Sequence, residues 1–481
     1  MPTSAEVPAL AAARPARAGG DDGSSARGAR GTFAALSVRN FRRYVSGQAL
    51  SLIGTWVETV AQALLVLRLT HSGAVLGLVT AARFAPVLLL SPYAGLLVDR
   101  FPKRRVLLVT QAGLGLVSLG LGILVLSGHA SLGQVVVLAL VFGTFSAADN
   151  PARQAFVAEV VGRDLIRNAV TLNSTAVNVA RVVGPAVAAA LVSTVGLGWC
   201  FIANAASFCF VIASLLLLEG RQLHPVRPVR RAAGQLRAGL RYAASVPEIA
   251  RPLLMMAMIG TFTFEFEVSL PLLARDTFGG TDTTYSWLIG ALGAGAVLGG
   301  LYAARSQRTG LRRLTRAAAA YAVAAGLLAA APTLPAAVAA CAITGAASVV
   351  FLTTGNSTIQ LTSDPAYRGR VTALWSLALV GSTSIGSPII GTLSQLTSPR
   401  WALALGAAAC AVAAAIGHWP VSPRSQPGPA HTEPVSALLR QPDHSFSRGD
   451  RQLRARRDDP VPEIVTAPAL WELMYFGKTT A

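Results

Sequence analysis

The chain has 481 residues, of which 53% are hydrophobic and only 13% are charged, and it carries a formal net charge of +19. An average soluble domain has roughly 25% charged residues, and a soluble protein of this length would need a charged surface that this composition cannot supply. The composition therefore excludes a purely soluble protein and fits about twelve membrane helices of roughly 20 residues each.

Both ends of the chain differ in composition from its middle. Residues 1–40 are rich in Ala, Arg, Gly and Ser, and residues 419–481 in Pro, Arg, Asp and Ser, without sustained hydrophobic periodicity. We therefore expect two disordered cytoplasmic tails. Gly477-Lys478-Thr479 is similar to the end of a phosphate-binding loop, but Glu472 stands where that loop requires its first glycine, so no nucleotide site is expected.

Between the tails, twelve apolar segments have the length of a membrane span. Six lie in residues 41–218 and six in residues 252–418, separated by a basic cytoplasmic loop over 219–251. Within this loop Leu236, Leu240 and Ala243 share one helical face, which predicts a helix on the cytoplasmic surface. The segments cover residues 44–67, 75–98, 106–126, 132–148, 169–195, 200–218, 252–273, 285–304, 317–332, 336–352, 371–393 and 401–416.

The basic residues of the connections predict the orientation. Twenty-one Lys and Arg residues lie in the connections on one side, whereas Arg68, Arg275 and Arg400 lie on the other. Because cytoplasmic loops carry the excess of basic residues, we expect a multi-pass protein of the cell membrane with both termini in the cytoplasm. This distribution also accounts for the net charge, so nucleic acid is not an expected partner.

The two groups of six segments predict an internal repeat. Landmark residues recur at an offset of about 205 positions, and an even number of spans in each half makes the repeats parallel. Carriers with alternating access place their binding site between two such halves. The paired landmarks are Gly95 and Gly300, Asn150 and Asn356, Gln154 and Gln360, Ser174 and Ser376, and Pro185 and Pro388.

The connection between the second and third spans, residues 95–105, holds the sharpest motif. Asp99 follows a helix whose dipole disfavours an acid there, so it needs an external partner, and Gly95 permits a close helix approach. The stretch resembles the signature loop of the major facilitator superfamily, with Pro102 in place of the usual second glycine. The resemblance implies a latch on the cytoplasmic gate; the alternative is a turn that only carries cytoplasmic charge. The gating residues would be Gly95, Asp99, Arg100, Lys103 and Arg104.

Three further stretches, residues 149–155, 168–174 and 180–185, resemble the enterobactin-exporter and macrolide-efflux branch of this superfamily. With the signature loop, the similarity spans most of residues 41–418. Gly184-Pro185 is similar to the Gly-Pro motif in the fifth span of exporters, although Ala188 and Ala189 stand where paired glycines follow. Pro185 frees a backbone carbonyl and Gly184 removes bulk, which predicts a kink used either for movement or for static packing.

Ionisable residues inside spans are costly, so each is a candidate for function. In the first span Glu58 and Gln62 continue a polar stripe that begins with Ser51 and Thr55, and we expect this stripe to face water or substrate. In the seventh span Thr261, Glu265 and Ser269 follow the same spacing. Because first helices of each repeat line the cavity in the superfamily, the resemblance favours Glu58 and Glu265 for proton or substrate coupling.

Four more charged residues belong to this candidate set. Glu267 points away from the stripe of the seventh span and is expected nearer its outer end. Arg83 and Arg181 are the cations well inside spans, and either can pair with the acids of the stripes or with Asp149. The sequence allows two roles for these arginines: a structural ion pair or a part in transport.

Enzyme chemistry is disfavoured. The six histidines lie at span ends, in loops or in tails, and the four cysteines lie in apolar runs without metal-ligand spacing, so we expect no metal site, no cofactor and no His-based catalytic pair. A membrane-embedded hydrolase or transferase is therefore less well supported by the sequence than a transporter.

We therefore expect an all-α membrane protein whose twelve transmembrane helices form two parallel six-helix repeats. The resemblance implies a secondary active transporter, monomeric in the lipid bilayer, that exports a small amphipathic or siderophore-like molecule by proton antiport and alternating access. Two alternatives stay open: a gradient-driven uptake permease for a small metabolite, and a transport-inactive membrane scaffold.

Overall fold

The structure is a computed structural model that describes residues 34–224, 235–306, 309–364 and 367–418. Within these ranges every regular element is helical. The predicted disorder of the tails falls almost entirely outside them and stays a prediction. The elements are η1 (Ala34–Ser37), α2 (Arg39–Thr70), α3 (Gly73–Arg100), α4 (Lys103–Leu126), α5 (Leu132–Thr194), α6 (Leu197–Leu216), η2 (Gly220–Gln222), α7 (Gln235–Ser245), α8 (Pro247–Phe262), α9 (Phe266–Leu272), η3 (Leu273–Thr277), α10 (Asp282–Arg305), α11 (Leu311–Ala330), α12 (Leu334–Thr362), α13 (Arg368–Leu396) and α14 (Pro399–His418).

The twelve-span layout predicted from the sequence is present. Eleven segments of the described chain are long and apolar enough to cross a membrane. The remaining span is α11, where three arginines at the start and an alanine-rich remainder lower the mean hydropathy. This helix packs against α12 and α14. The predicted helix in the basic loop is α7, in which Ala243 is buried and Leu240 is exposed.

The fourth and fifth spans meet at a sharp corner. The sequence predicts two separate segments, whereas the structure continues helical geometry from one into the other and interrupts it only at Gly162, with φ of 71°. Glycine adopts a positive φ without a Cβ clash, which allows the chain to reverse there within one residue. We therefore correct the predicted loop between residues 148 and 169 to a one-residue corner inside α5.

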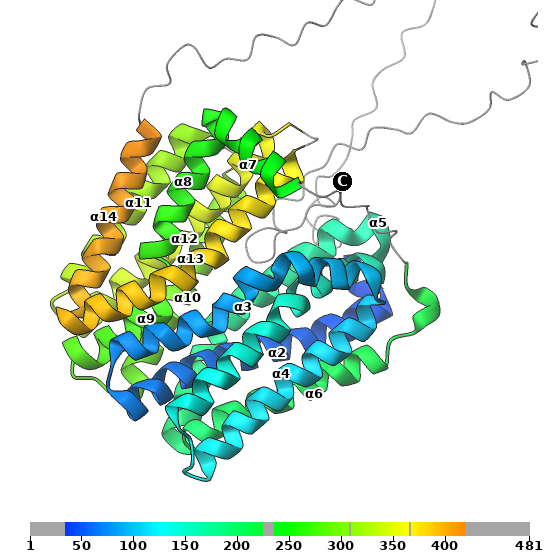
Figure 1. Ribbon diagram of the computed structural model, residues 1–481, viewed down its shortest axis with the longest axis horizontal. Coiled ribbons are helices and arrows are strands. Elements are labelled where there is room, and N and C mark those ends of the chain that lie inside the picture. Colours follow the sequence, from blue (N-terminus) through cyan, green and yellow to red (C-terminus); the bar gives the residue numbers. More distant parts are fainter. Residues whose placement is uncertain (1–33, 225–234, 307–308, 365–366, 419–481) are drawn as a thin grey trace, which may run out of the picture.

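The two halves of the molecule meet through two helix pairs that a parallel two-fold repeat relates. Helix α3 of the first half packs on α13, and α10 of the second half packs on α5. These backbones approach closely, because a Cβ placed on Gly77 would lie 2.2 Å from the carbonyl oxygen of Ser387. Figure 1 shows the first half in blue to green beside the second half in green to orange.

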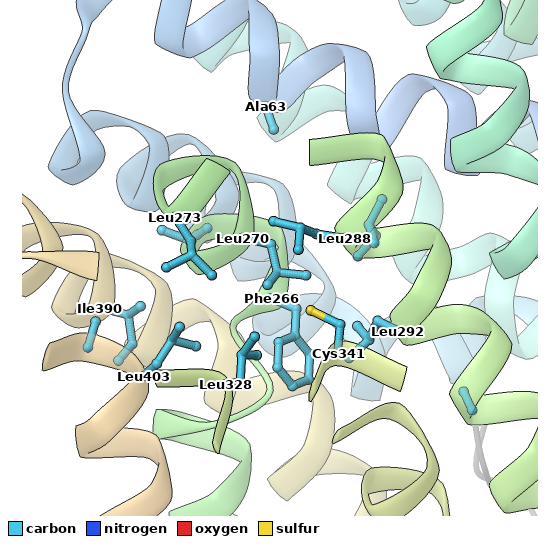
Figure 2. Close-up of a cluster of buried hydrophobic side chains, with 14 of the residues drawn as sticks. Ala63, Phe266, Leu270, Leu273, Leu288, Leu292, Leu328, Cys341, Ile390 and Leu403 are labelled. Atoms are coloured by element: carbon cyan, nitrogen blue, oxygen red, sulfur yellow. The ribbon is translucent and has the colours of Figure 1, made fainter. Parts of the chain in front are cut away.

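A large apolar core fills the second half around α9 (Figure 2). The Phe266 side chain lies between Leu328 of α11 and Cys341 of α12. The core reaches α2 of the first half, where Ala63 belongs to the same cluster. Packing around α9 therefore fixes the position of the short helix that carries Glu267.

The contact between α3 and α13 generates a prediction about stability. Gly77→Val should lower the melting temperature of the detergent-purified protein, because the added side chain must push α3 and α13 apart, at a cost of about 1–3 kcal/mol. Gly120→Val is the matched control, since a Cβ at Gly120 of α4 meets nothing within 4 Å. Equal melting temperatures for the two variants would contradict the close packing.

Candidate functional site

Charged side chains from both halves gather where the halves meet. Arg83 lies on α3, Arg181 on the last part of α5, and Glu267 at the start of α9. Since an α-helix rises about 1.5 Å per residue, Arg83 lies about 15 Å along α3 from Gly73. We call these three residues the central charge cluster.

Arg83 is fixed by side chains of its own half. Its Nη1 donates a hydrogen bond of 2.6 Å to Oε1 of Gln62 on α2. The guanidinium lies over the Phe142 ring of α5, 4.2 Å from the ring centroid. The residue is only 8% exposed, so hydrogen bonding and the aromatic face hold a buried cation in one place.

Arg181 is held in a similar way. Its guanidinium lies 5.4 Å from the centroid of the Trp56 ring on α2. Its backbone carbonyl meets the second half, since a Cβ placed on Gly293 of α10 would lie 2.8 Å from that oxygen. Arg181 therefore sits on the seam between α5 and α10.

Glu267 supplies the charge from the other half. Arg83 and Arg181 both act electrostatically on its carboxylate. Two further titratable groups of the second half lie within the same electrostatic range, Tyr285 of α10 and Glu265. The sequence allowed either arginine to pair with the acids of the seventh span, and the structure places Glu267 within electrostatic range of both Arg83 and Arg181.

The seventh span is broken beside Glu267, which corrects the single helix that the sequence predicts. Helix α8 ends at Phe262 and α9 begins at Phe266, with Glu265 as the residue that precedes it. Thr263 lies in the break and donates from Oγ1 to the carbonyl oxygen of Gly406 at 2.9 Å. Because the two short helices do not share one helical phase, spacing along the sequence misplaces the side chains that follow the break.

Glu265 is buried inside the second half. The hydroxyl of Ser387 on α13 donates a hydrogen bond to its Oε2. Its side chain lines a small cavity with Thr263 and Ser269, between α11, α13 and α14. Broken helices next to internal cavities are common sites of ion and substrate binding in carriers.

Glu58 points into the first half, away from the seam. It is 2% exposed, and its Oε2 accepts hydrogen bonds from Ser118 of α4 and from Nδ2 of Asn204 on α6, the latter at 2.6 Å. Ser207 donates to Oδ1 of Asn204 at 3.0 Å. The expected stripe is thus divided: Glu58 faces α4 and α6 rather than water, whereas Gln62 faces Arg83.

Asp149 also has its partners within the first half. It accepts from Oγ1 of Thr110 at 2.7 Å and from Nε2 of Gln111 at 2.8 Å, and it forms an ion pair with Arg153 one turn later. The sequence allowed Asp149 as a partner of Arg83 or Arg181; the structure pairs it with Arg153.

The residues of the signature loop contact their own half. Lys103 lies 3.7 Å from the carboxylate of Glu159 on α5, and Arg104 donates to the carbonyl oxygen of Leu216 at 3.1 Å. Gly95 is buried and Arg100 is exposed, while the side chain of Asp99 lies outside the described part of the structure. The latch assigned to Asp99 therefore stays a prediction.

Gly184 and Pro185 lie inside α5, one turn beyond Arg181. A Cβ placed on Gly184 would lie 2.4 Å from Cβ of Trp56, so the glycine lets α5 approach α2 closely. This contact positions the Trp56 ring beside Arg181.

One end of the molecule is sealed by polar contacts between the halves. Arg68 of α2 forms an ion pair with Asp282 of α10, and Nη2 of Arg275 donates to the carbonyl oxygen of His71 at 3.3 Å. Ser72 donates to Oε1 of Gln395 on α13 at 2.5 Å. We call this end the closed end. Sequence reasoning missed it, although Arg68 and Arg275 are among the few basic residues on that side.

Among the residues described here, no group of three His, Cys, Asp or Glu could hold a metal ion. The candidate site consists of charged and hydrogen-bonding groups, buried or partly buried, near the seam between two helical repeats.

The chain is similar in sequence to known membrane transporters. The sequence profile of the transmembrane secretion effector family matches residues 30–433. The enterobactin exporter EntS of Shigella boydii is 26% identical over 360 residues, covering 74% of this chain and 84% of that protein. The staphyloferrin A transporter of Staphylococcus aureus is 31% identical over 176 residues, covering 36% of this chain and 44% of that protein.

Solved structures agree on the fold. A bacterial homologue of the iron transporter ferroportin in an inward-facing state superposes with a TM-score of 0.64 at 15% identity, covering 79% of this chain and 98% of that one. A bacterial homologue of the lysosomal transporter Spinster, also inward-facing, gives 0.62 at 16% identity, covering 79% and 95%. These similarities show the shared architecture.

The Asp149 network generates a second stability prediction. Asp149→Ala should destabilise the protein by about 3–5 kcal/mol, because it removes the carboxylate that Arg153, with a side chain only 12% exposed, contacts. Asp276→Ala is the matched control, since Asp276 and its partner Arg275 are 35% and 32% exposed and such pairs contribute about 0–1 kcal/mol. Melting temperatures in detergent would measure both. A loss for Asp149→Ala no larger than for the control would contradict the structural role of Asp149.

Proposed function

Because the chain belongs to the transmembrane secretion effector family of the major facilitator superfamily, we propose that this membrane transporter exports a small amphipathic or siderophore-like molecule from the cytoplasm in exchange for protons. One observation carries the proposal: Arg83, Arg181 and Glu267 lie inside helices of the two six-helix repeats, which pack against each other through α3, α13, α5 and α10. Carriers of this architecture bind substrate and coupling ion at such a seam. Similarity to an enterobactin exporter supports the outward direction.

The distribution of basic residues supports an orientation for this transporter. The closed end carries Arg68 and Arg275, whereas the twenty-one basic residues of the other connections lie at the opposite end. We therefore assign the closed end to the outside and both termini to the cytoplasm. In this assignment the molecule is poised to receive cargo from the cytoplasm.

The geometry favours Glu267 over Glu58 and Glu265 as the proton carrier. A bound proton can shift a conformational equilibrium only if the two states bind it with different free energies. The hydrogen-bond partners of Glu58 lie in the first half, as Glu58 does. Ser387, which donates to Glu265, lies in the second half with Glu265. Each carboxylate therefore moves together with its partners. Glu267 lies within electrostatic range of Arg83 and Arg181 of the opposite half, so we expect its surroundings to change when the halves separate.

Two conservative variants test this assignment. Glu267→Gln should retain exchange of substrate across the membrane but lose acceleration by an imposed pH gradient, because the amide has the shape of the carboxylic acid and binds no proton. Glu58→Gln is the matched control and should keep the response to the gradient. Uptake of labelled substrate into proteoliposomes measures both rates. A normal gradient response in Glu267→Gln would refute the assignment.

The proposal of export is tested in proteoliposomes with the purified full chain and enterobactin as the probe. Antiport predicts that enterobactin moves against the direction of proton flow and that it accumulates only while the gradient lasts. Movement in the same direction as protons would show uptake by symport instead. Macrolides form the second panel of probes, and failure to move any probe would overturn the proposed range of cargo.

A further inference from the structure

The start of α3, at the closed end, is capped in part by its own half. Ser72 is the N-cap residue, and its Oγ accepts a hydrogen bond from the backbone N–H of Val75 at 3.2 Å. The N–H groups in the first turn of a helix have no partner inside the helix, so each needs an acceptor from elsewhere. Ser72 supplies the acceptor for Val75.

The other half of the molecule supplies the next acceptor. Oε1 of Gln395, in the last turn of α13, accepts from the backbone N–H of Ala74 at 3.0 Å and from the Ser72 hydroxyl at 2.5 Å. The hydroxyl of Ser72 thus accepts from its own helix and donates across the seam, which joins both caps in one chain of hydrogen bonds. A helix of the first half is therefore capped by a side chain of the second half.

The backbones around this cap are in close contact. A Cβ placed on Gly391, one turn before Gln395 in α13, would lie 2.3 Å from the carbonyl oxygen of Gly73. A Cβ placed on Gly73 would lie 2.9 Å from Cδ1 of Leu272 in α9. The start of α3 is thus enclosed by α13 and α9. The amide of Gln395 reaches Ala74 because α3 and α13 touch, so separating the halves at this end breaks the cap.

We propose that Gln395 holds the closed end shut by capping α3, and that this end opens to the outside only when the cap is released. The inference rests on the proposed transport function, since a carrier has to open this end to release its cargo. Two neutral hydrogen bonds favour the closed state and are still weak enough to break in every transport cycle. Release also ends the contact of Gly73 with Leu272, so α9 parts from α3 in the same step.

The first half offers a cap of the same chemistry that does not cross the seam. At the start of α5, Oε1 of Gln134 accepts from the hydroxyl and from the backbone N–H of Ser131, both at 2.9 Å. Both residues belong to the first half, so opening of the closed end leaves this cap intact. Gln134→Ala is therefore the matched control for Gln395→Ala.

Labelling of a buried thiol measures the opening without cargo and without a gradient. Thr80 is 7% exposed and lies on the face of α3 that Gly73 and Gly77 share. In the full chain in lipid nanodiscs, Thr80→Cys should react with a water-soluble maleimide when α3 and α13 separate, so the labelling rate follows the open fraction. Every sample carries Cys209→Ser, because Cys209 is exposed whereas the other three cysteines are buried.

Three variants in this background test the role of Gln395. Gln395→Ala should raise the labelling rate at least about fivefold, because two hydrogen bonds across the seam are lost. Gln395→Glu should label no faster than the natural side chain, because a carboxylate accepts the same bonds and is favoured at a helix N-terminus. This variant guards against misfolding of Gln395→Ala. Gln134→Ala should leave the rate unchanged.

Two results would overturn the proposal. The first is a labelling rate in Gln395→Ala that does not exceed the rate with the natural side chain or with Gln134→Ala. The second is a rise in Gln395→Glu as large as in Gln395→Ala, because the acceptor would then not be what holds the end shut.

The outcomes also separate this inference from the proposed function. Faster labelling of Gln395→Ala in a protein that moves no probe in proteoliposomes would keep the role of Gln395 and refute export. Unchanged labelling of Gln395→Ala in a protein that exports enterobactin would refute the role of Gln395 and keep export.

Discussion

A charge in the middle of a membrane needs a partner, and this requirement organises the interior of the molecule. Asp149 and Arg153 meet it within one turn of α5, and Glu58 meets it with polar groups from α4 and α6. These pairings stay within one half and stabilise it as a unit. The central charge cluster differs because its acid and its two cations belong to opposite halves. The electrostatic interaction among them therefore depends on how the halves are arranged.

The same seam is built so that the backbones can approach and part. Glycines bring α3 against α13, as at Gly77, and bring α10 against α5 at Gly293. Small residues at such contacts leave few interlocking side chains to disengage. The polar contacts of the closed end, such as the Arg68–Asp282 pair, are exposed and cost little to break. The molecule therefore has two internally stabilised halves, which meet through small residues and a few charged side chains. This arrangement fits rigid-body movement of one half against the other.

Much of the fold could be predicted from the sequence, because hydropathy marks the spans and recurring landmark residues mark the repeats. The neighbours of the candidate site residues were harder to predict from the sequence. Helical spacing placed Glu58, Gln62 and Glu265 on stripes expected to face water or substrate. All three are buried, and spacing could not say which neighbouring helix each side chain meets. Nothing in the local pattern marks the break over residues 263–265, where Thr263 bonds to Gly406 in a distant helix. Hydrogen-bond partners that are far apart in sequence are brought together only by the packing of the helices.

As the proposed proton carrier, Glu267 should favour the closed end while it is ionised, and the distance across that end tests this most directly. Spin labels at the exposed positions Leu69 and Leu396, on α2 and α13, would report the separation of the halves by double electron–electron resonance. Lowering the pH should increase the population with the longer distance, since protonation removes the charge that the two arginines hold. An unchanged distance distribution at every pH at which the protein stays folded would contradict the account.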